Sequence, residues 1–308
     1  MKKTNHPISR REFLGRSIAS GAALTFGLPA AHALAADGAS SRQLDRWILL
    51  ADTHICQDRN REEHGIKPAE KLAEARAQIL ELESPPSGLI IAGDCAYLHG
   101  EAADYAVLGE DLAPLMGAGI PAYMSMGNHD NRERFWDAFP EARARSAHSG
   151  LDKHVHVVDA PNADWFILDS NKETDFTPGE LGEAQLAWLA AELDKRPGKP
   201  ALLVAHHYPT AKKDDNGLLD FDALWSVIHP RSRVKAYLFG HSHRWAYEQR
   251  DGVHLVNLPA LAWLFGDQAA PRAWTQASIA PDGMDLHLHC LNDRIPPDGG
   301  RLHLPWRA

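Results

Sequence analysis

The feature that most constrains this chain is a set of five short motifs rich in Asp, Asn and His, each of which follows an apolar run. The central motif is Gly-Asn-His-Asp at residues 127–130, directly after the run 120–126. An amide oxygen beside an imidazole at a strand end can place one group on a metal and the other on a substrate. The other four motifs are, in chain order, Asp52-Thr53-His54, Gly93-Asp94, His206-His207-Tyr208-Pro209 and Gly240-His241-Ser242-His243.

The spacing of apolar residues predicts alternating strands and helices in the first half of the chain and antiparallel strands in the last part. Residues 47–50 form a continuous apolar run, typical of a strand covered on both faces. Helical spacing begins at Pro68, and short alternating segments follow residue 253. This order predicts an α/β fold, a four-layer α/β/β/α sandwich of two mixed sheets flanked by helices. The polar, Arg-rich stretch 132–149 is predicted to be a loop.

Residues 1–35 are predicted to be an export signal. Arg10 and Arg11 precede an uncharged segment at 18–31, and the small-x-small sequence 33–35 suits cleavage. The paired arginines resemble the twin-arginine signal, which as a family trait carries proteins that have already folded. This resemblance implies contact with the twin-arginine export machinery, a periplasmic location and a mature domain at 36–308; a retained N-terminal anchor is the alternative.

The composition of residues 36–308 restricts the possible partners. This part of the chain has 27 Lys and Arg against 40 Asp and Glu, a net charge of −13. An acidic chain lacks the basic footprint for nucleic acid or for an anionic membrane surface. Three cysteines are too few for a disulfide scaffold. We therefore expect a small phosphoester substrate, no nucleic acid and no stable membrane insertion after signal cleavage.

The motif residues suit a binuclear metal site. Two divalent ions about 3.5–4 Å apart can share a hydroxide and neutralise phosphoryl oxygens. Ions so close need a bridging carboxylate, for which Asp94 is the candidate. Mixed oxygen and imidazole ligands suit manganese, iron or zinc better than calcium. The predicted ligands are Asp52, His54 and His243 for one ion and Asn128, His207 and His241 for the other, with Asp94 shared.

The five motifs in this order resemble the calcineurin-like metallophosphoesterase superfamily over residues 45–290. The resemblance implies hydrolysis of small phosphomonoesters or phosphodiesters, by attack of a metal-bridging hydroxide on phosphorus. By the same resemblance, His129 faces the substrate, where it stabilises the phosphoryl charge or protonates the leaving oxygen, and Asp130 orients it. The oligomeric state and the physiological substrate stay open.

Two departures from the family pattern leave alternatives. The family commonly shows H-x-P in the fourth motif, a phase that makes His207 the ligand and His206 its neighbour. Gly-Asp-x-x-Tyr, ending at Tyr97, resembles purple acid phosphatases, in which this tyrosine ligates ferric iron. Because His54 is also present, we expect His54 to be the ligand and Tyr97 to pack nearby. An iron monoesterase and a noncatalytic metal- or ligand-binding relative remain as alternatives.

Two further groups of residues have two interpretations each. Asp169-Ser170-Asn171 follows a predicted strand and either faces the cleft or forms a strand-ending turn. The aromatic residues Trp263, Phe265 and Trp274 either line a substrate pocket or belong to the core, the commoner position for large aromatic side chains.

Overall fold

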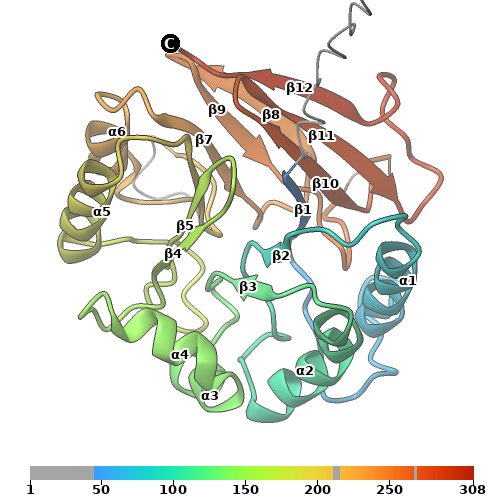
Figure 1. Cartoon of the computed structure of the whole chain (residues 1–308). Helices are drawn as coiled ribbons and strands as arrows, with labels where there is room; N and C mark the ends of the chain where they lie inside the picture. Colours follow the sequence, from blue (N-terminus) through green and yellow to red (C-terminus); the bar gives the residue numbers. More distant parts are fainter. Residues whose placement is uncertain (1–44, 211–215, 267–268) are drawn as a thin grey trace, which may run out of the picture. The chain divides into compact units, whose positions relative to one another are not determined.

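A computed structural model of the chain describes residues 45–210, 216–266 and 269–308 (Figure 1). The predicted export signal and its cleavage site lie outside these residues. Among the helices that are described, none has the length and apolar character that a membrane span requires.

The first sheet has its parallel strands on one side and its antiparallel strands on the other. β1, β2 and β3 are parallel, whereas β10 joins β1 in antiparallel pairing and continues into β11 and β12. The order across this sheet is β12 (Arg301–Pro305), β11 (Gly283–Cys290), β10 (Ala273–Ala280), β1 (Asp45–Leu50), β2 (Gly88–Ile91) and β3 (Ala122–Met124).

The second sheet has four parallel strands between two antiparallel edge strands. β5, β6, β7 and β9 run parallel, and β4 and β8 pair in antiparallel fashion at the two edges. The order across this sheet is β4 (His156–Asp159), β5 (Asp164–Ile167), β6 (Ala201–Val204), β7 (Val234–Phe239), β9 (Val253–Asn257) and β8 (Ala246–Arg250).

Helices cover the outer face of each sheet, and three hydrophobic cores separate the four layers (Figure 1). Strand β1 shows how one strand serves two cores, since Ile48 and Leu50 face the helices while Trp47 and Leu49 face the other sheet. The predicted four-layer sandwich is confirmed. The helices are α1 (Pro68–Leu80), α2 (Ala102–Gly117), α3 (Arg132–Ala138), α4 (Pro140–Ala147), α5 (Glu183–Lys195) and α6 (Phe221–Ile228).

The predicted loop at 132–149 is wrong, because this stretch contains α3 and α4. The side chain of Asn131 accepts a hydrogen bond from the backbone N–H of Arg134 and so caps α3. Phe135 is fully buried in the helix-side core of the first sheet, and Pro140 stands in the first turn of α4. Two short helices escape a periodicity argument because each completes only about two turns at 3.6 residues per turn.

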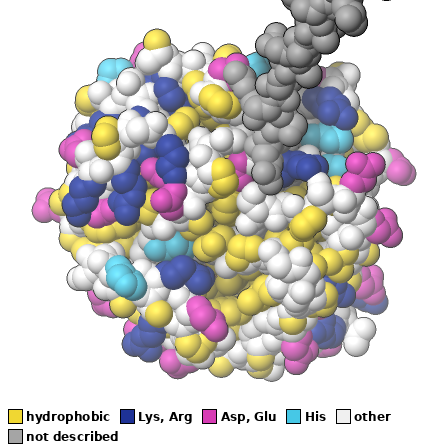
Figure 2. Space-filling view, viewed as in Figure 1, with side chains coloured by type: hydrophobic (Ala, Val, Ile, Leu, Met, Phe, Trp, Pro, Cys, Tyr) yellow, Lys and Arg dark blue, Asp and Glu magenta, His cyan; other side chains and the backbone are white. Residues whose placement is uncertain are grey.

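All five motifs follow parallel strands at their carboxyl ends. β1, β2 and β3 lead into Asp52, Asp94 and Asn128, and β6 and β7 lead into His206 and His241. Ligands of open α/β sheets bind beyond this end of the strands. On the face shown in Figure 2, Lys and Arg side chains are interspersed with Asp and Glu, so this face carries mixed charge.

Candidate metal centre

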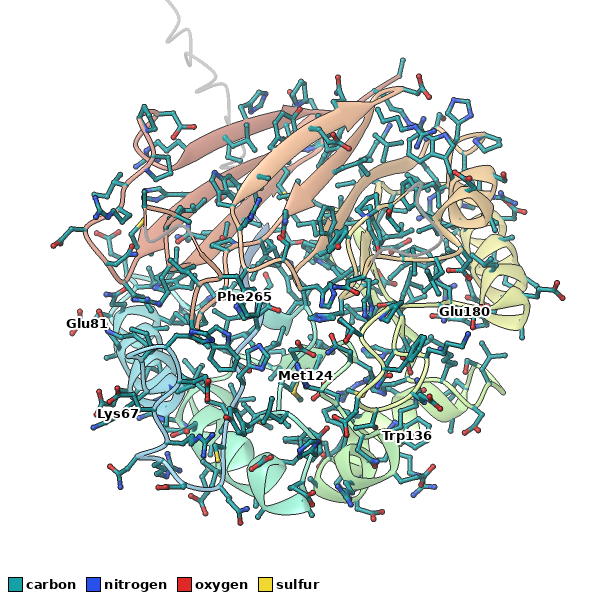
Figure 3. All side chains as sticks on the ribbon, turned by 180° about the vertical axis from the view of Figure 1, so that it is seen from behind. Lys67, Glu81, Met124, Trp136, Glu180 and Phe265 are labelled. Atoms are coloured by element: carbon teal, nitrogen blue, oxygen red, sulfur yellow. The ribbon has the colours of Figure 1, made fainter. Side chains whose placement is uncertain are left out.

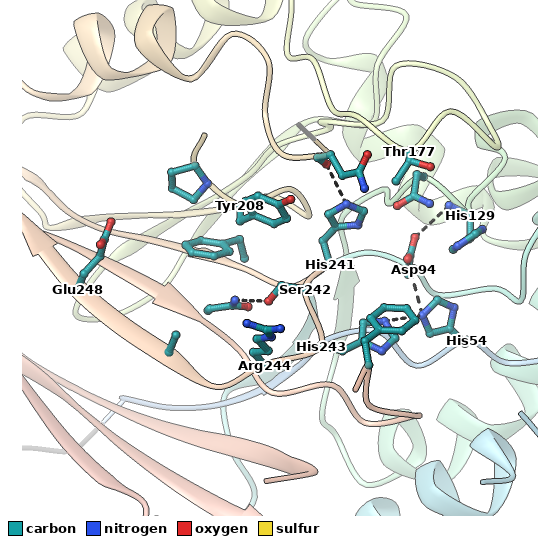
Figure 4. Close-up of a pocket in the computed structure, with 17 residues that line it drawn as sticks. His54, Asp94, His129, Thr177, Tyr208, His241, Ser242, His243, Arg244 and Glu248 are labelled. Atoms are coloured by element: carbon teal, nitrogen blue, oxygen red, sulfur yellow. Dashed lines mark hydrogen bonds and ion pairs between the residues drawn. The ribbon is translucent and has the colours of Figure 1, made fainter. Parts of the chain in front are cut away.

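The motif side chains converge on a cavity of about 690 Å³. His54, Asp94, Asn128 and His129 line one end of it, and Figure 4 shows His241 and His243 turned toward the same space. In Figure 3, which views the molecule from behind, the pocket residue Phe265 lies toward the middle, whereas Lys67 and Glu180 lie at the periphery. Strand ends from both sheets therefore contribute to one site.

The first group of candidate ligands comes from the first and last motifs. The Nε2 atoms of His54 and His243 lie 3.1 Å apart, and His243 Nε2 is 3.4 Å from Asp52 Oδ1. His54 Nε2 is 3.7 Å from Asp94 Oδ2. All four side chains are almost completely buried. This arrangement can hold one metal ion.

The second group centres on the imidazole of His206. Its Nε2 lies 3.2 Å from Asp94 Oδ2, 3.3 Å from Asn128 Oδ1 and 3.1 Å from His241 Nδ1. The same oxygen of Asp94 thus faces both groups. This is the position that a bridging carboxylate requires.

The structure places His206, and not the predicted ligand His207, beside the shared carboxylate of Asp94, although His206, His207 and His241 together also form a group that could hold a metal ion. His207 Nε2 lies 2.9 Å from the carbonyl oxygen of Thr177, and its Nδ1 lies 2.8 Å from the hydroxyl of Ser170, so both ring nitrogens are engaged outside the cluster. The reason is the alternation of side chains along β6. Leu202 and Val204 face the other sheet, and His206 continues that face into the site, whereas His207 falls on the helix side.

The hydrogen bonds of three histidines fit a cation in their midst. His206 Nδ1, His241 Nε2 and His243 Nδ1 each lie within hydrogen-bond distance of a backbone carbonyl, at 2.9, 2.9 and 2.6 Å. In a neutral ring, each of these nitrogens carries the proton, so the other nitrogen, which faces the cluster, presents a lone pair. Lone pairs and carboxylates that converge in this way repel one another unless positive charge lies between them.

The pKa values of the clustered side chains also indicate that a cation belongs between them. Burial lowers the pKa of His241 to about 3 and that of His243 to about 4, so both rings are neutral and able to bind a metal. Burial also raises the pKa of Asp52 to about 7. Although burial lowers the pKa of His206, the charge of Asp94 outweighs it and raises that pKa to about 9. The cluster therefore retains protons wherever no cation balances its carboxylates.

Strained backbone aims the ligands. A positive φ is uncommon for residues other than glycine and costs on the order of 1–3 kcal/mol at each position. Side chains leave such a backbone in directions that a regular strand does not offer. The strained ligands are Asp52 (φ 53°), His54 (φ 46°), Asp94 (φ 48°), His241 (φ 69°) and His243 (φ 54°).

Two motif glycines allow the loops to approach the carboxylates. A Cβ atom at Gly127 would lie 2.1 Å from Asp94 Oδ1, and one at Gly240 would lie 2.6 Å from Asp52 Oδ2. Any side chain at these positions would displace a ligand. The glycines therefore belong to the site although they offer no ligand atom.

His129 lies beside Asp94 but is oriented differently from the prediction. Its backbone N–H donates to Asp94 Oδ1 at 3.0 Å, and its Nδ1 donates to the carbonyl of Leu98 at 2.7 Å. The ring is therefore held by Leu98, not by the carboxylate of Asp130. Its Nε2 has no hydrogen-bond partner among the described residues, and His129 lines the cavity. His129 also forms, with His54 and Asp94, a group that could hold a metal ion.

Asp130 joins two loops instead. Its carboxylate accepts hydrogen bonds from the backbone N–H groups of Gly127, Cys95 and Ala96 and from the hydroxyl of Tyr105. Burial raises the pKa of Asp130 to about 6. This residue fixes the loop that carries Asp94 against the loop that carries Asn128 and His129.

The segment Asp169-Ser170-Asn171 supports the site from behind, a role that the sequence left open. The amide of Asn171 donates to the backbone carbonyl of Asp130 at 2.7 Å, and the hydroxyl of Ser170 contacts His207. The carboxylate of Asp169 pairs with Arg132. These residues follow β5, so the signal that could have revealed them is the one that revealed the motifs: polar residues directly after a buried strand.

Tyr97 is directed away from the cluster. Its hydroxyl lies 2.7 Å from Glu63 Oε2 and 2.7 Å from Arg61 Nη2. Burial raises the pKa of this phenol, which opposes a tyrosinate. The expected packing position is what the structure shows, since the ring of Tyr97 meets that of Trp263 edge to face.

The three aromatic residues divide between pocket and core. Phe265 stacks on the ring of His243 at 4.3 Å and lines the cavity, with 47% of its surface exposed. Trp263 is buried and stacks on His54 at 4.1 Å. Trp274 is a core residue that stacks on His289.

Comparison with known proteins identifies the family. Residues 46–245 match the family model described as calcineurin-like phosphoesterase. A probable cyclic nucleotide phosphodiesterase of Rhodopseudomonas palustris is 38% identical over 206 residues, which cover 65% of this chain and 72% of that protein. A 3',5'-cyclic-nucleotide phosphodiesterase of Nostoc is 28% identical over 74% of this chain and 82% of that protein.

Solved structures share the fold at low sequence identity. A dimetal phosphatase from Danio rerio superposes with a TM-score of 0.66 at 17% identity, over 85% of this chain and 99% of that one. A protein described as the anchor in the inner membrane complex of Plasmodium superposes with a TM-score of 0.58 at 11% identity, over 86% and 90%. With the family match and the two ligand groups in place, the chain belongs to the calcineurin-like phosphoesterase family and is a hydrolase of phosphoric ester bonds that uses two metal ions.

Proposed function

We propose that this enzyme hydrolyses the cyclic phosphodiester of 3',5'-cyclic nucleotides. The observation that carries the proposal is the 38% identity, over 206 residues, to a relative named as a probable cyclic nucleotide phosphodiesterase. The range that matches the family model, residues 46–245, includes all five motifs. A second relative, from Nostoc, has the same activity in its name. The cavity volume of about 690 Å³ also lies within the range of about 300–1,000 Å³ that is usual for small-molecule sites.

The residues of the site divide the work of the reaction. When bound, two divalent ions supply positive charge for the phosphoryl oxygens and lower the pKa of a water molecule. Asp52, Asp94 and His206 belong to the groups that would hold these ions. His129, held through Nδ1 by Leu98, presents Nε2 to the cavity, where its protonated form can donate to the departing ribose 3'-oxygen.

The test compares a cyclic diester with its monoester product. The protein is stripped of metal, resupplied with manganese and assayed with 3',5'-cyclic AMP and 5'-AMP. We expect manganese to restore hydrolysis of the cyclic diester. Turnover of 5'-AMP without turnover of the cyclic nucleotide would make the enzyme a monoesterase and overturn the proposal.

No contact in the site supports the two alternatives, an iron monoesterase and a noncatalytic metal- or ligand-binding protein. The iron monoesterase depended on Tyr97, whose hydroxyl is bound to Glu63 and Arg61. The similarity to the Plasmodium anchor shows the fold alone. Both ligand groups are complete here, which favours catalysis over a purely structural role.

The proposed location is the periplasm, by export through a twin-arginine signal. The support is the pair Arg10 and Arg11 before an uncharged segment. In cell fractionation, we expect the protein in the periplasm and a double variant with Arg10→Lys and Arg11→Lys in the cytoplasm. Equal export of both forms would argue against this route.

A further inference from the structure

The wall of the cavity beyond the metal centre is built by alternate residues of the exposed strand β8 and of the segment directly before it. Arg244, Ala246 and Glu248 all line the cavity, and two-residue spacing in an extended chain turns side chains to one face. Tyr247 turns the other way, and its hydroxyl bonds His254 Nδ1 at 3.0 Å. β8 is an edge strand and every residue in it is exposed.

Two charged side chains line this part of the cavity, that of Arg244 just before β8 and that of Glu248 within it. Among the described residues, the side chains of Arg244 and Glu248 make neither a hydrogen bond nor an ion pair. Ala246 lies between them in the sequence. Its small side chain leaves space on the floor of the cavity between the two opposite charges. In Figure 4, Glu248 lies at the end of the cavity far from His54 and His129, and Arg244 lies between.

Aromatic rings complete this part of the cavity. The ring of Tyr208 stacks against that of the candidate ligand His241, with centroids 5.5 Å apart and planes at 28°. Phe239, at the end of β7, is also part of the wall. A flat ligand that enters beside Ala246 thus meets aromatic surface and, at its edges, one hydrogen-bond donor group and one acceptor group.

We propose that this arm, defined by Tyr208, Phe239, Arg244, Ala246 and Glu248, binds the nucleobase of the substrate. The inference rests on the proposed function and assigns the part of the site that recognises the base. An arginine donates to a ring nitrogen, and a carboxylate accepts from an exocyclic amino group. Adenine presents these two groups side by side, and its face packs on aromatic rings. The arm therefore suits a base with an amino group beside a ring acceptor.

A second, baseless substrate separates the arm from the chemistry. Bis(p-nitrophenyl) phosphate offers the same diester to the metal centre but carries no base. The kcat/KM values for 3',5'-cyclic AMP and for this compound are compared in the manganese-loaded wild type, in Arg244→Gln and in Ala246→Trp, which fills the floor between the charges. Arg250→Gln is the control, because Arg250 belongs to the same strand but packs over the ring of Trp225.

We expect Arg244→Gln to lower kcat/KM for cyclic AMP about tenfold, mainly through KM, as the loss of one charged contact predicts. Ala246→Trp should lower it at least as much. Both variants should retain the wild-type kcat/KM for bis(p-nitrophenyl) phosphate, and the control should retain both. For the wild-type enzyme, the KM for cyclic UMP, whose base has no amino group, should be higher than the KM for cyclic AMP.

The outcomes distinguish this inference from the proposed function. A wild type that hydrolyses cyclic AMP, with both variants unchanged in the ratio of the two substrates, overturns the base site and leaves the function standing. A wild type that cleaves only bis(p-nitrophenyl) phosphate overturns the function. In that case calorimetry with adenosine and metal-free protein decides the site: binding that Ala246→Trp abolishes supports it, and absence of binding removes it.

Discussion

At one end of the cavity, side chains point inward from buried and strained backbone; at the other, Glu248 extends from the exposed edge strand β8 and Arg244 from the segment directly before it. The metal end is held by backbone carbonyls, by the Asp130 carboxylate and by Asn171, so that each ligand has a fixed direction. Within the part of the chain that the structure describes, the side chains of Arg244 and Glu248 have no comparable hydrogen bonds or ion pairs. We infer that each ligand at the metal end is held by several contacts, whereas the residues at the Arg244 and Glu248 end can change without disturbing the metal site.

The largest expected effect is the loss of the shared carboxylate. Asp94→Asn keeps the shape but removes the charge that faces both ligand groups, so activity should fall on the order of a thousandfold or more. Unlike the β8 variants, it should affect cyclic AMP and bis(p-nitrophenyl) phosphate alike. Kinetics and elemental analysis of bound metal measure this, with the exposed Asp285→Asn as control. A change in the substrate ratio would break the separation of the two ends.

The next effect separates two adjacent histidines. His206→Ala should lose bound metal and most activity, because His206 Nε2 faces Asp94, Asn128 and His241. His207→Ala should retain its metal but lose about 1–3 kcal/mol of folding free energy, since Ser170 and the Thr177 carbonyl lose their partner. Metal content and thermal unfolding measure both. Loss of metal from His207→Ala alone would restore the sequence-based assignment.

A smaller effect is expected behind the ligands. Asn171→Ala removes the amide that fixes the Asp130 carbonyl, and activity should fall about tenfold on both substrates, as for other groups that orient metal ligands. Asn162→Ala is a matched control, because its amide also donates to a backbone carbonyl, that of Ile279. Equal activity of the two variants would mean that the metal end needs less support than its contacts suggest.

The smallest effect concerns the metal-free protein. His206 has a pKa of about 9 in the folded state, against 6.5 when unperturbed, and Asp52 about 7 against 3.8. Both folded-state pKa values are raised, so their stabilisation is greatest at low pH. It falls from pH 3.8 to about 7 for Asp52 and from 6.5 to about 9 for His206. Because of these two groups, the melting temperature of the metal-free protein should fall between pH 6 and 9, relative to that of the metal-loaded protein.

Much of the fold and most of the cluster could be predicted, because apolar runs mark strands and polar residues after them mark strand ends. Asp52, His54, Asp94, Asn128, His241 and His243 all lie where this argument puts them. The choice between His206 and His207 needed the alternation counted back through β6, whose two faces pack on different cores. The family pattern aligned on proline pointed to His207 instead, whereas it is His206 that lies beside Asp94.

Other parts of the site could not have been predicted from local pattern. The Asp130 carboxylate binds backbone N–H groups of a loop 35 residues earlier, and such contacts have no side-chain signature. The face that Arg244 and Glu248 share depends on where β8 begins and on its pairing with β9. In a short polar edge strand, the sequence indicates neither the first residue of the strand nor its pairing partner.

The positive φ angles of the five ligands also bear on how a chain of this kind can drift. Replacing such a ligand with glycine would relieve on the order of 1–3 kcal/mol of backbone strain at that position. Mutations that abolish catalysis can therefore leave the scaffold more stable than before. Selection for hydrolysis, and not for folding, is then what keeps Asp52, His54, Asp94, His241 and His243 in place, and a lineage released from that selection would retain its sandwich after losing its metals.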